Sequence, residues 1–313
     1  MPDRDGSHAL AHGVPGAPGP AAGLRRSGRS PGPHRSARHQ GTVGQRRRGP
    51  VGAAWSRLPA MARRIVLAVA LIALWALYIR LRHVSPLVFA SPEATLAAFG
   101  RGWASGELAS ATAATLEVLL LGIGIGLVLA AAFTVWATAT TIGNDLLTLL
   151  TAAINPLPSI AVLPLAMIWF GVSAKAVVFV VAESVLWPLA INMVSGFTSV
   201  NPILVMVGRS LGLRRWQYIR RVLLPGALPS IISGVNIAWA MAWRTAIAAE
   251  LVFGTAGGNG GLGYFINTSQ YFLKIPDVLA GLTTIGIVGC AVQAGLGRFE
   301  ARTVVRWGMK PAA

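Results

Sequence analysis

Four arginines alternate with apolar and aromatic residues in one short stretch of the chain, residues 213–222. This spacing predicts a short amphipathic helix with its basic side chains on one face. Such a helix can rest on anionic lipid, dock on a soluble partner or lie in a solvated loop. The basic residues and the first aromatic residue of the stretch are Arg214, Arg215, Trp216, Arg220 and Arg221.

Ionisable residues also interrupt apolar segments, at Glu183, Arg244 and Glu250. Charges at membrane depth are costly, so each of them marks a candidate site. Because a guanidinium offers a planar fork of donors to oxyanions, Arg244 is the preferred contact for an anionic solute. The alternative is a structural ion pair between Arg244 and Glu183 or Glu117 on a facing helix. Glu250 is expected near the outer end of its segment, where it reaches water.

The uncharged segment 146–174 contains helix-breaking residues at Asn155, Pro156, Pro158 and Pro164. A proline has no N–H, so a carbonyl of the preceding turn loses its partner. Free backbone groups at membrane depth are tolerated where they face protein or a water-filled cavity. The segment therefore either lines a path through the membrane or is kinked for packing alone, and the residues leave both alternatives open.

The composition is that of a membrane protein. Of the 313 residues, 54% are hydrophobic and 12% are charged, against about 25% charged residues in soluble domains. A crossing helix needs about 20 apolar residues, and because backbone in lipid must pair internally, we predict an all-α membrane protein with a six-helix bundle. The predicted spans are about 62–81, 114–136, 148–170, 176–199, 227–250 and 278–297.

The net charge of +17 is unevenly distributed, because 12 of the 27 Lys and Arg lie in residues 1–64. Placing both termini in the cytoplasm puts most positive charge inside, as membrane proteins prefer. Residues 1–60 are rich in Arg, Gly and Pro without an apolar period, which predicts a disordered head. The head either binds anionic lipid or nucleic acid, or is a solvated tail. A start codon assigned too early is a further interpretation, because Met61 opens an Ala-Arg-Arg sequence before a long apolar run.

Other chemistry is excluded or unsupported by the residues. Cys290 is the only cysteine, which excludes an intrachain disulfide and a multi-cysteine zinc site, and no metal site is expected. The chain contains no GxxxxGK[ST] sequence, so no nucleotide site of its own is expected. The glycine-rich sequence 254-GTAGGNGGLG-263 lacks the Lys-Ser/Thr of such a site and predicts a flexible turn.

The loop between the fourth and fifth predicted spans, residues 200–226, resembles the cytoplasmic signature of bacterial ATP-binding-cassette importer permeases, EAA-x3-G-x9-I-x-LP. The similarity runs from Gly212 to Val222, Leu224 and Pro225 at the spacing of the signature. The resemblance implies that this loop couples the permease to an ATPase subunit.

The same loop departs from the signature at its first positions. The EAA letters fall on Met206, Val207 and Gly208. In the family, the glutamate of this motif would form a salt bridge with the ATPase subunit. Met206 stands at that position and offers no carboxylate for such a salt bridge.

Three further segments are similar to the nitrate, sulfonate, taurine and bicarbonate branch of this family. They are 155-NPLPSIAVLPLAMIWFG-171, 243-WRTAIAAEL-251 and 299-FEARTVVRW-307. The resemblance covers about 61–310, and the permease domain is predicted over 61–313. The substrate is not fixed by membership of the branch.

The resemblance implies an assembly in the bacterial inner membrane. Two permease subunits, identical or paired, would stand above two cytoplasmic ATPase subunits, and a periplasmic binding protein would deliver a small anionic solute. ATP would be bound by the partner subunits, so the permease would need no cofactor and no catalytic residue, and no nucleic-acid partner is expected. In the family the glycine-rich stretch after the fifth span re-enters the bundle near the outer gate.

Two other functions compete with this interpretation. A secondary transporter driven by an ion gradient tends to have internal repeats and paired broken helices, whereas this chain has one broken span without a matching second half. A non-transporting membrane anchor would not need Arg244, Glu183 and three prolines inside its spans.

Overall fold

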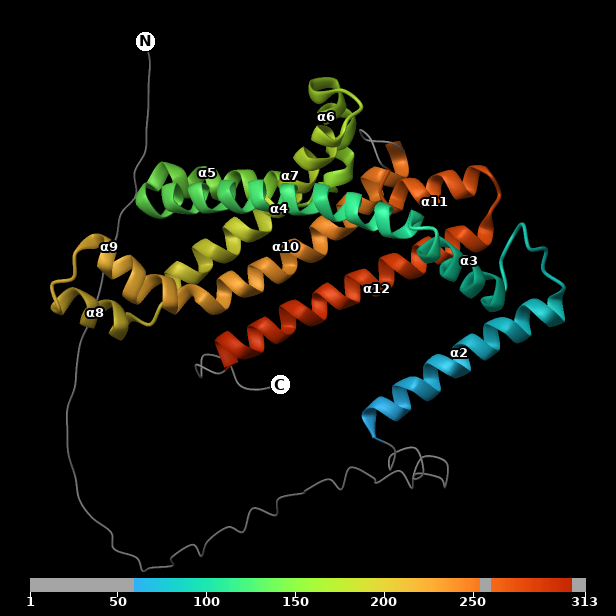
Figure 1. The fold of residues 1–313 in the computed structure, drawn as a ribbon. Coiled ribbons are helices and arrows are strands. Elements are labelled where there is room, and N and C mark those ends of the chain that lie inside the picture. The colour runs from blue at the N-terminus through green and yellow to red at the C-terminus, as the bar shows by residue number, and fades with distance from the viewer. Residues whose placement is uncertain (1–58, 254–259, 306–313) are drawn as a thin grey trace, which may run out of the picture. The chain divides into compact units, whose positions relative to one another are not determined.

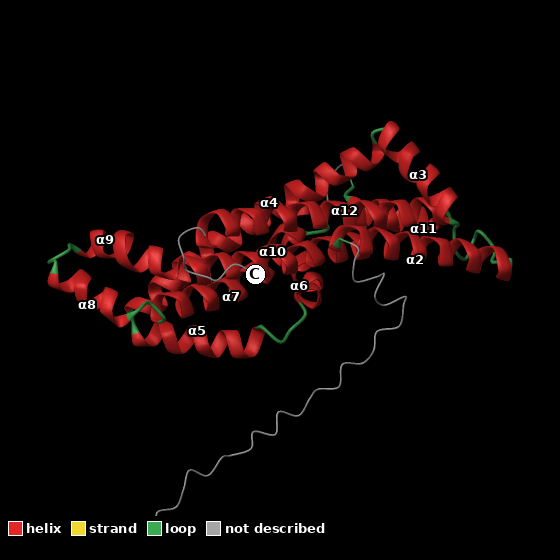
Figure 2. Cartoon of the chain, turned by 90° about the horizontal axis from the view of Figure 1, so that it is seen from below, coloured by secondary structure: helices red, strands yellow, loops and turns green. Residues whose placement is uncertain are grey.

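The computed structural model describes residues 59–253 and 260–305, and every regular element in these ranges is helical (Figures 1 and 2). The chain divides into two units, Met1–Pro59 and Ala60–Ala313. The predicted head lies almost wholly outside the described residues, so its disorder and the alternative start stay predictions.

The described part of the chain has five helices long and apolar enough to cross a membrane, or six if one bent pair counts as a span. The predicted all-α membrane class is confirmed, while the side on which the termini lie stays a prediction. The five long helices are α2 (Ala60–Arg82), α4 (Glu107–Ala139), α7 (Ala174–Thr198), α10 (Leu224–Phe253) and α12 (Ile275–Glu300). The shorter elements are α3 (Pro92–Ala104), α5 (Thr141–Ile154), η1 (Ser159–Val162), α6 (Leu163–Phe170), α8 (Pro202–Ser210), α9 (Arg215–Tyr218), η2 (Ile219–Leu223), α11 (Leu262–Tyr271) and η3 (Ala301–Val305).

The third predicted span is not one straight helix over 148–170. It consists of α5 and the η1–α6 segment, which meet at 93° across a short break. The break falls at residues 155–158 because the prolines cannot continue the hydrogen-bond ladder of α5. Helix α5 also begins earlier than predicted, where the Thr140 hydroxyl accepts a hydrogen bond from the Gly143 N–H at 3.0 Å.

The fifth span also differs from the prediction, which placed a separate short helix before a span starting near residue 227. Instead α9, η2 and α10 run on as one apolar helix from Trp216 to Val252. Segment η2 is π-helical, and the N–H of Leu224 reaches back to the carbonyl of Ile219. This wider turn lets the helix continue past Pro225, which has no N–H to donate.

The core lies along α7, which packs between α4 and α10 (Figure 1). Two thirds of the apolar window of α7, 67%, is buried. Helix α4 approaches α7 through glycines: a Cβ on Gly126 would lie 2.7 Å from the Ala182 carbonyl oxygen, and one on Gly122 would lie 2.5 Å from Val181. Small residues at such contacts let membrane helices pack closely.

We therefore expect Gly126→Ala to weaken the α4–α7 contact by about 1–3 kcal/mol, because the neighbouring backbone cannot yield to the added methyl group. The melting temperature of the purified protein measures this loss. Gly124→Ala is the matched control, since a Cβ at Gly124 meets nothing within 4 Å. Equal melting temperatures for the two variants would contradict the close approach.

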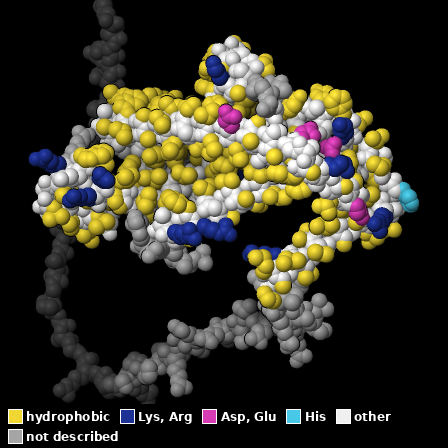
Figure 3. Space-filling view, in the orientation of Figure 1, with side chains coloured by type: hydrophobic (Ala, Val, Ile, Leu, Met, Phe, Trp, Pro, Cys, Tyr) yellow, Lys and Arg dark blue, Asp and Glu magenta, His cyan; other side chains and the backbone are white. Residues whose placement is uncertain are grey.

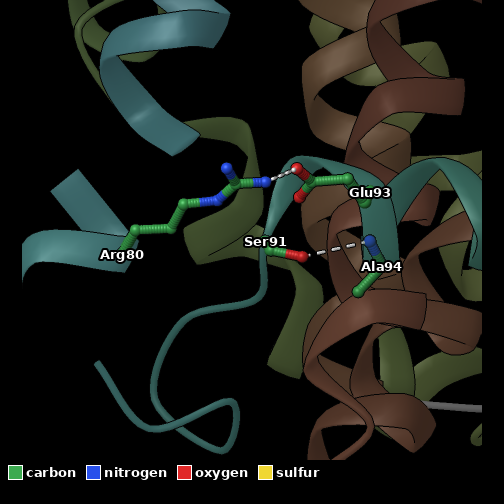
Figure 4. Close-up of polar contacts among 4 residues, drawn as sticks. All are labelled: Arg80, Ser91, Glu93 and Ala94. Atoms are coloured by element: carbon green, nitrogen blue, oxygen red, sulfur yellow. Dashed lines mark hydrogen bonds and ion pairs between the residues drawn. The ribbon is translucent and has the colours of Figure 1, made fainter. Parts of the chain in front are cut away.

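The turn from α2 to α3 is closed by polar contacts (Figure 4). Arg80 Nη2 lies 3.1 Å from Glu93 Oε1, and Ser91 Oγ accepts a hydrogen bond from the Ala94 N–H at 3.2 Å. The pKa of Glu93 is held below its usual value, first by its own backbone N–H, then by Ser91 and Arg80. The ion pair therefore persists at neutral pH and is lost as the pH falls through the lowered pKa. Because both side chains are largely exposed, it adds little stability.

Candidate solute pathway and coupling segment

A cavity of about 450 Å³ lies where the break between α5 and η1 faces α7 and α10. The break contributes Asn155, Pro156 and Pro158, helix α7 contributes Glu183, and α10 contributes Arg244. Five of the seven residues predicted to line a path are thus brought together at one cavity. Separate stretches of the chain converge there because the 93° bend turns the break toward the other two helices.

Glu183 and Arg244, the two charged residues among the described lining of this cavity, do not form an ion pair with each other. The guanidinium of Arg244 is exposed, and no carboxylate oxygen among the described residues lies within 4.0 Å of it. Glu183 is partly buried, and its Oε1 accepts a hydrogen bond from Trp187 Nε1 at 3.1 Å. The alternative of a direct ion pair between Arg244 and Glu183 or Glu117 is therefore absent from the described structure, and Glu117 is exposed on α4.

Helix α7 is itself interrupted beside this cavity. Pro188 lies inside α7 and lines the cavity together with Ser184. Because Pro188 has no N–H, the carbonyl of Ser184 lacks its helical donor. Interrupted backbone within a membrane-spanning helix is typical of segments that line a cavity. Pro188 was not predicted from the sequence as a lining residue.

Pro164 and Glu250 lie elsewhere. Pro164 stands in the first turn of α6, where a missing N–H costs little, so it starts a helix and does not break one. Glu250 does not reach water as expected: its side chain is 4% exposed. Both residues are absent from the lining of the cavity.

The carboxylate of Glu250 joins three helices. Its Oε2 accepts hydrogen bonds from Thr115 Oγ1 in α4 and from the Gly263 N–H in α11, both at 2.9 Å. Thr115 Oγ1 in turn accepts a hydrogen bond from the Leu262 N–H at 2.8 Å. The positive end of the α11 dipole favours a negative charge at this place. Glu250 thus ties the start of α11 to α4 and α10.

The glycine before α11 is required by this packing. A Cβ on Gly261 would overlap the Glu250 carboxylate. Thr115 was not singled out from the sequence, because it lies 135 residues before Glu250. Gly261 belongs to the glycine-rich sequence that was predicted to form a flexible turn. Most of the predicted glycine-rich turn, residues 254–259, lies outside the described residues.

Helices α8 and α9, which contain or flank the arginine-rich stretch 213–222, form one end of the bundle (Figure 1). Helix α8 and the α9–η2 segment are joined by a tight turn at Gly212, whose φ of 62° is in the left-handed region that glycine favours. Helices α3 and α11 lie at the opposite end. The predicted break at Gly212 is confirmed.

The side chains of this end suit contact with a partner or with lipid. Arg214, Arg220 and Arg221 are exposed, and Trp216 is 69% exposed. Figure 3 shows Lys and Arg side chains gathered over α8 and α9, while hydrophobic side chains cover much of the rest of this face. Large exposed aromatic and basic groups together are typical of binding surfaces.

The residues at the EAA positions, which depart from the signature, lie in α8. Gly208 is buried, and a Cβ there would lie 2.9 Å from the Tyr218 ring. Met206, at the position of the motif's glutamate, is 60% exposed. The last EAA position thus packs α8 against α9, whereas the first one faces outward.

Comparisons with known proteins show the family of the chain. The family described as "Binding-protein-dependent transport system inner membrane component" matches residues 122–302. The taurine transport system permease protein TauC of Escherichia coli (strain K12) is 29% identical over 245 residues, covering 74% of this chain and 85% of that protein. The putative aliphatic sulfonates transport permease protein SsuC of the same strain is 32% identical over 241 residues, covering 77% and 90%.

A solved structure shows the same fold at low sequence identity. The crystal structure of an amino acid ABC transporter with histidines superposes with a TM-score of 0.54 at 20% identity, covering 65% of this chain and 97% of that one. Among the described residues, the bundle with its five or six apolar helices is that of an all-α membrane protein. The chain belongs to the family of binding-protein-dependent transport system inner membrane components and is a permease subunit of an ATP-binding-cassette importer.

Proposed function

We propose that this permease carries a small anionic solute of the sulfonate kind through the cavity between the α5–η1 break, α7 and α10. The observation that carries this proposal is Arg244, an exposed guanidinium lining the cavity with no carboxylate oxygen within 4.0 Å among the described residues. A planar fork of donors fits the oxygens of a sulfonate. The names of the taurine and aliphatic sulfonate relatives support the same class of solute.

The remaining parts of the proposed assembly follow from the family. Two permease subunits, identical or paired, stand side by side, and two ATPase subunits dock on the segment α8–α9–η2. ATP is bound by those partners, and the permease contributes neither a catalytic residue nor a cofactor. The solute is delivered by a periplasmic binding protein.

The proposed orientation places both termini in the cytoplasm of a bacterial cell, with the permease in the inner membrane. The bias of Lys and Arg toward the inner segments supports this orientation. The exposed arginines of the coupling end support it as well, because the ATPase subunits are cytoplasmic.

The test of the pathway is Arg244→Gln in the complete transporter reconstituted in liposomes. Loss of the charge-assisted contact is expected to lower kcat/KM for sulfonate uptake by about ten- to a hundredfold. Uptake of radiolabelled solute at several concentrations measures the change, with ATP supplied on the side of the ATPase subunits.

Arg101→Gln serves as the control, because Arg101 is an exposed arginine on α3 outside the cavity. It should leave uptake unchanged. Normal uptake by the Arg244→Gln transporter would reject this residue as the anion contact.

A further inference from the structure

An apolar groove of about 590 Å³ lies between α4, the end of α6 and α7, beside the solute cavity. Helix α7 contributes one stripe of side chains to it, from Lys175 to Trp187. Apart from Lys175 and Glu183, every described lining residue is hydrophobic. The α4 side chains of the lining are exposed, so the groove is open to the surroundings of the bundle. They are Leu121, Ile125 and Leu129.

Lys175 stands at one end of this groove. It is exposed at the start of α7, and no carboxylate oxygen among the described residues lies within 4.0 Å of its Nζ. The predicted apolar span of this helix begins at residue 176, so Lys175 lies at the edge of the apolar segment, where a lysine meets lipid headgroups. An unpaired ammonium at the end of an apolar groove matches a molecule with an anionic head and an apolar chain.

The length of the groove fits one leaflet of a membrane. From Lys175 to Trp187 the α7 stripe is about 18 Å long at the rise of an α-helix. One leaflet contributes half of the hydrocarbon core, which is about 15 Å. Because α7 leads from Lys175 toward α8, the charged end of the groove points away from the coupling end. The groove is thus long enough for one acyl chain whose head lies at Lys175.

The carboxylate of Glu183 does not oppose an anionic head at this place. Glu183 lies about two turns of α7 deeper than Lys175, which is about 12 Å along the helix. Its Oε1 accepts the hydrogen bond from Trp187 and its Oε2 is buried, so a chain in the groove meets little of the charge. Glu183 and Trp187 also line the solute cavity. They form the wall between that cavity and the groove.

We propose that this groove binds an anionic phospholipid, with the phosphate of the head on Lys175 and one acyl chain along α4 and α7. Such a lipid supplies in one molecule the negative charge that the ammonium lacks and the apolar surface that the groove lacks. The groove distinguishes this lipid from the general bilayer, because the ammonium selects the head while the exposed side chains of α4 hold the chain. The inference does not depend on which solute is carried.

The test titrates the purified permease–ATPase complex, stripped of lipid in detergent, with two lipids. Dioleoylphosphatidylglycerol has an anionic head, and dioleoylphosphatidylcholine has the same chains with a zwitterionic head. Native mass spectrometry measures the affinity of the first lipids bound. The unmodified complex is expected to bind the phosphatidylglycerol about five- to tenfold more tightly.

Variants assign this preference to the groove. Lys175→Gln should bring the two affinities to within about twofold. The matched control is Lys274→Gln, which changes another exposed lysine of the described residues outside the groove and should keep the preference. Ile125→Trp fills the groove from its exposed α4 side and should weaken both lipids by about fivefold or more.

The place of the chain is measured on the unmodified complex, so it does not depend on the folding of a variant. The complex is reconstituted in nanodiscs that contain phosphatidylglycerol with a diazirine in its acyl chain. After illumination, the crosslinked peptides are identified by mass spectrometry. Labels are expected on the groove segments of α4 and α7, residues 121–129 and 178–187.

Each contrary outcome overturns a stated part of the proposal. Equal affinities for the two lipids, or a preference that survives Lys175→Gln, would overturn the contact of the head with Lys175. Crosslinks that avoid residues 121–129 and 178–187 would overturn the place of the chain. If those segments stay unlabelled and Ile125→Trp separates two permease subunits, the groove is an interface between copies of this chain. None of these outcomes touches the sulfonate pathway, whose test rests on Arg244.

Discussion

Replacing Glu250 by alanine is expected to detach α11 from α4 and α10. The change removes the acceptor of Thr115 Oγ1 and of the Gly263 N–H, both at 2.9 Å, and leaves a void where the side chain is 4% exposed. Unpaired donors and a new cavity together cost about 3 kcal/mol or more. For a domain of this size, that loss lowers the melting temperature by roughly 6–12 °C.

The local effect of this variant is measured by hydrogen exchange. The amides of Leu262 and Gly263 donate to Thr115 and Glu250, so they should lose protection first. Exchange in α7, which lies in the centre of the bundle, should change least.

Two matched variants separate the charge from the packing. Glu250→Gln keeps the volume and one oxygen acceptor, so a smaller loss is expected. Glu117→Gln removes an exposed carboxylate two residues after Thr115 and should leave the melting temperature unchanged. A Glu250→Ala protein with the melting temperature and amide protection of the original would show that the contact does not hold α11.

The role of Glu250 illustrates where sequence reasoning ends. A carboxylate near the end of an apolar helix predicts a side chain that reaches water, and only the fold brings Thr115 and the start of α11 over it. Contacts over 135 residues leave no local pattern. The nearest signal in the sequence was Gly261. This position requires a residue without a side chain, because the Glu250 carboxylate lies against it.

The long helices were predictable because hydropathy is a local property. The fourth span, predicted at 176–199, is Ala174–Thr198 in the structure. The second begins seven residues before the prediction, at Glu107, because its first turns bury Leu108 and Ala111 against protein and need no continuous apolar run. Apolar length alone marks the lipid-spanning part of a helix and not its whole extent.

The cavity was predictable in its residues but not in its shape. Prolines in the third span indicated a break, and isolated charges indicated sites. The bend of 93° that brings the break to Glu183 and Arg244 depends on how α5, α7 and α10 pack. From the residues alone, pairing and solute contact both stayed open for Arg244, and the geometry separates the two charges.

Reversing the exposed charges of the coupling segment is expected to stop transport without unfolding the permease. In the triple variant Arg214→Glu, Arg220→Glu and Arg221→Glu, all three changed side chains are exposed. Charge reversal at a docking surface replaces attraction by repulsion and costs several kcal/mol. Uptake by the reconstituted transporter should therefore fall by at least about tenfold, while the melting temperature of the isolated permease stays the same.

Co-purification identifies which partner these arginines meet. If they dock the ATPase subunit, the triple variant loses that subunit on a size-exclusion column, and Trp216→Ala, which removes a side chain that is 69% exposed, weakens the same complex. Arg101→Glu, at the opposite end on α3, should retain it. If the arginines instead rest on lipid, the complex survives, and anionic lipid in the bilayer stabilises the triple variant less than the original permease. Unchanged uptake in the triple variant would reject the docking role, because a surface on which ATP-driven motion depends does not tolerate three reversed charges.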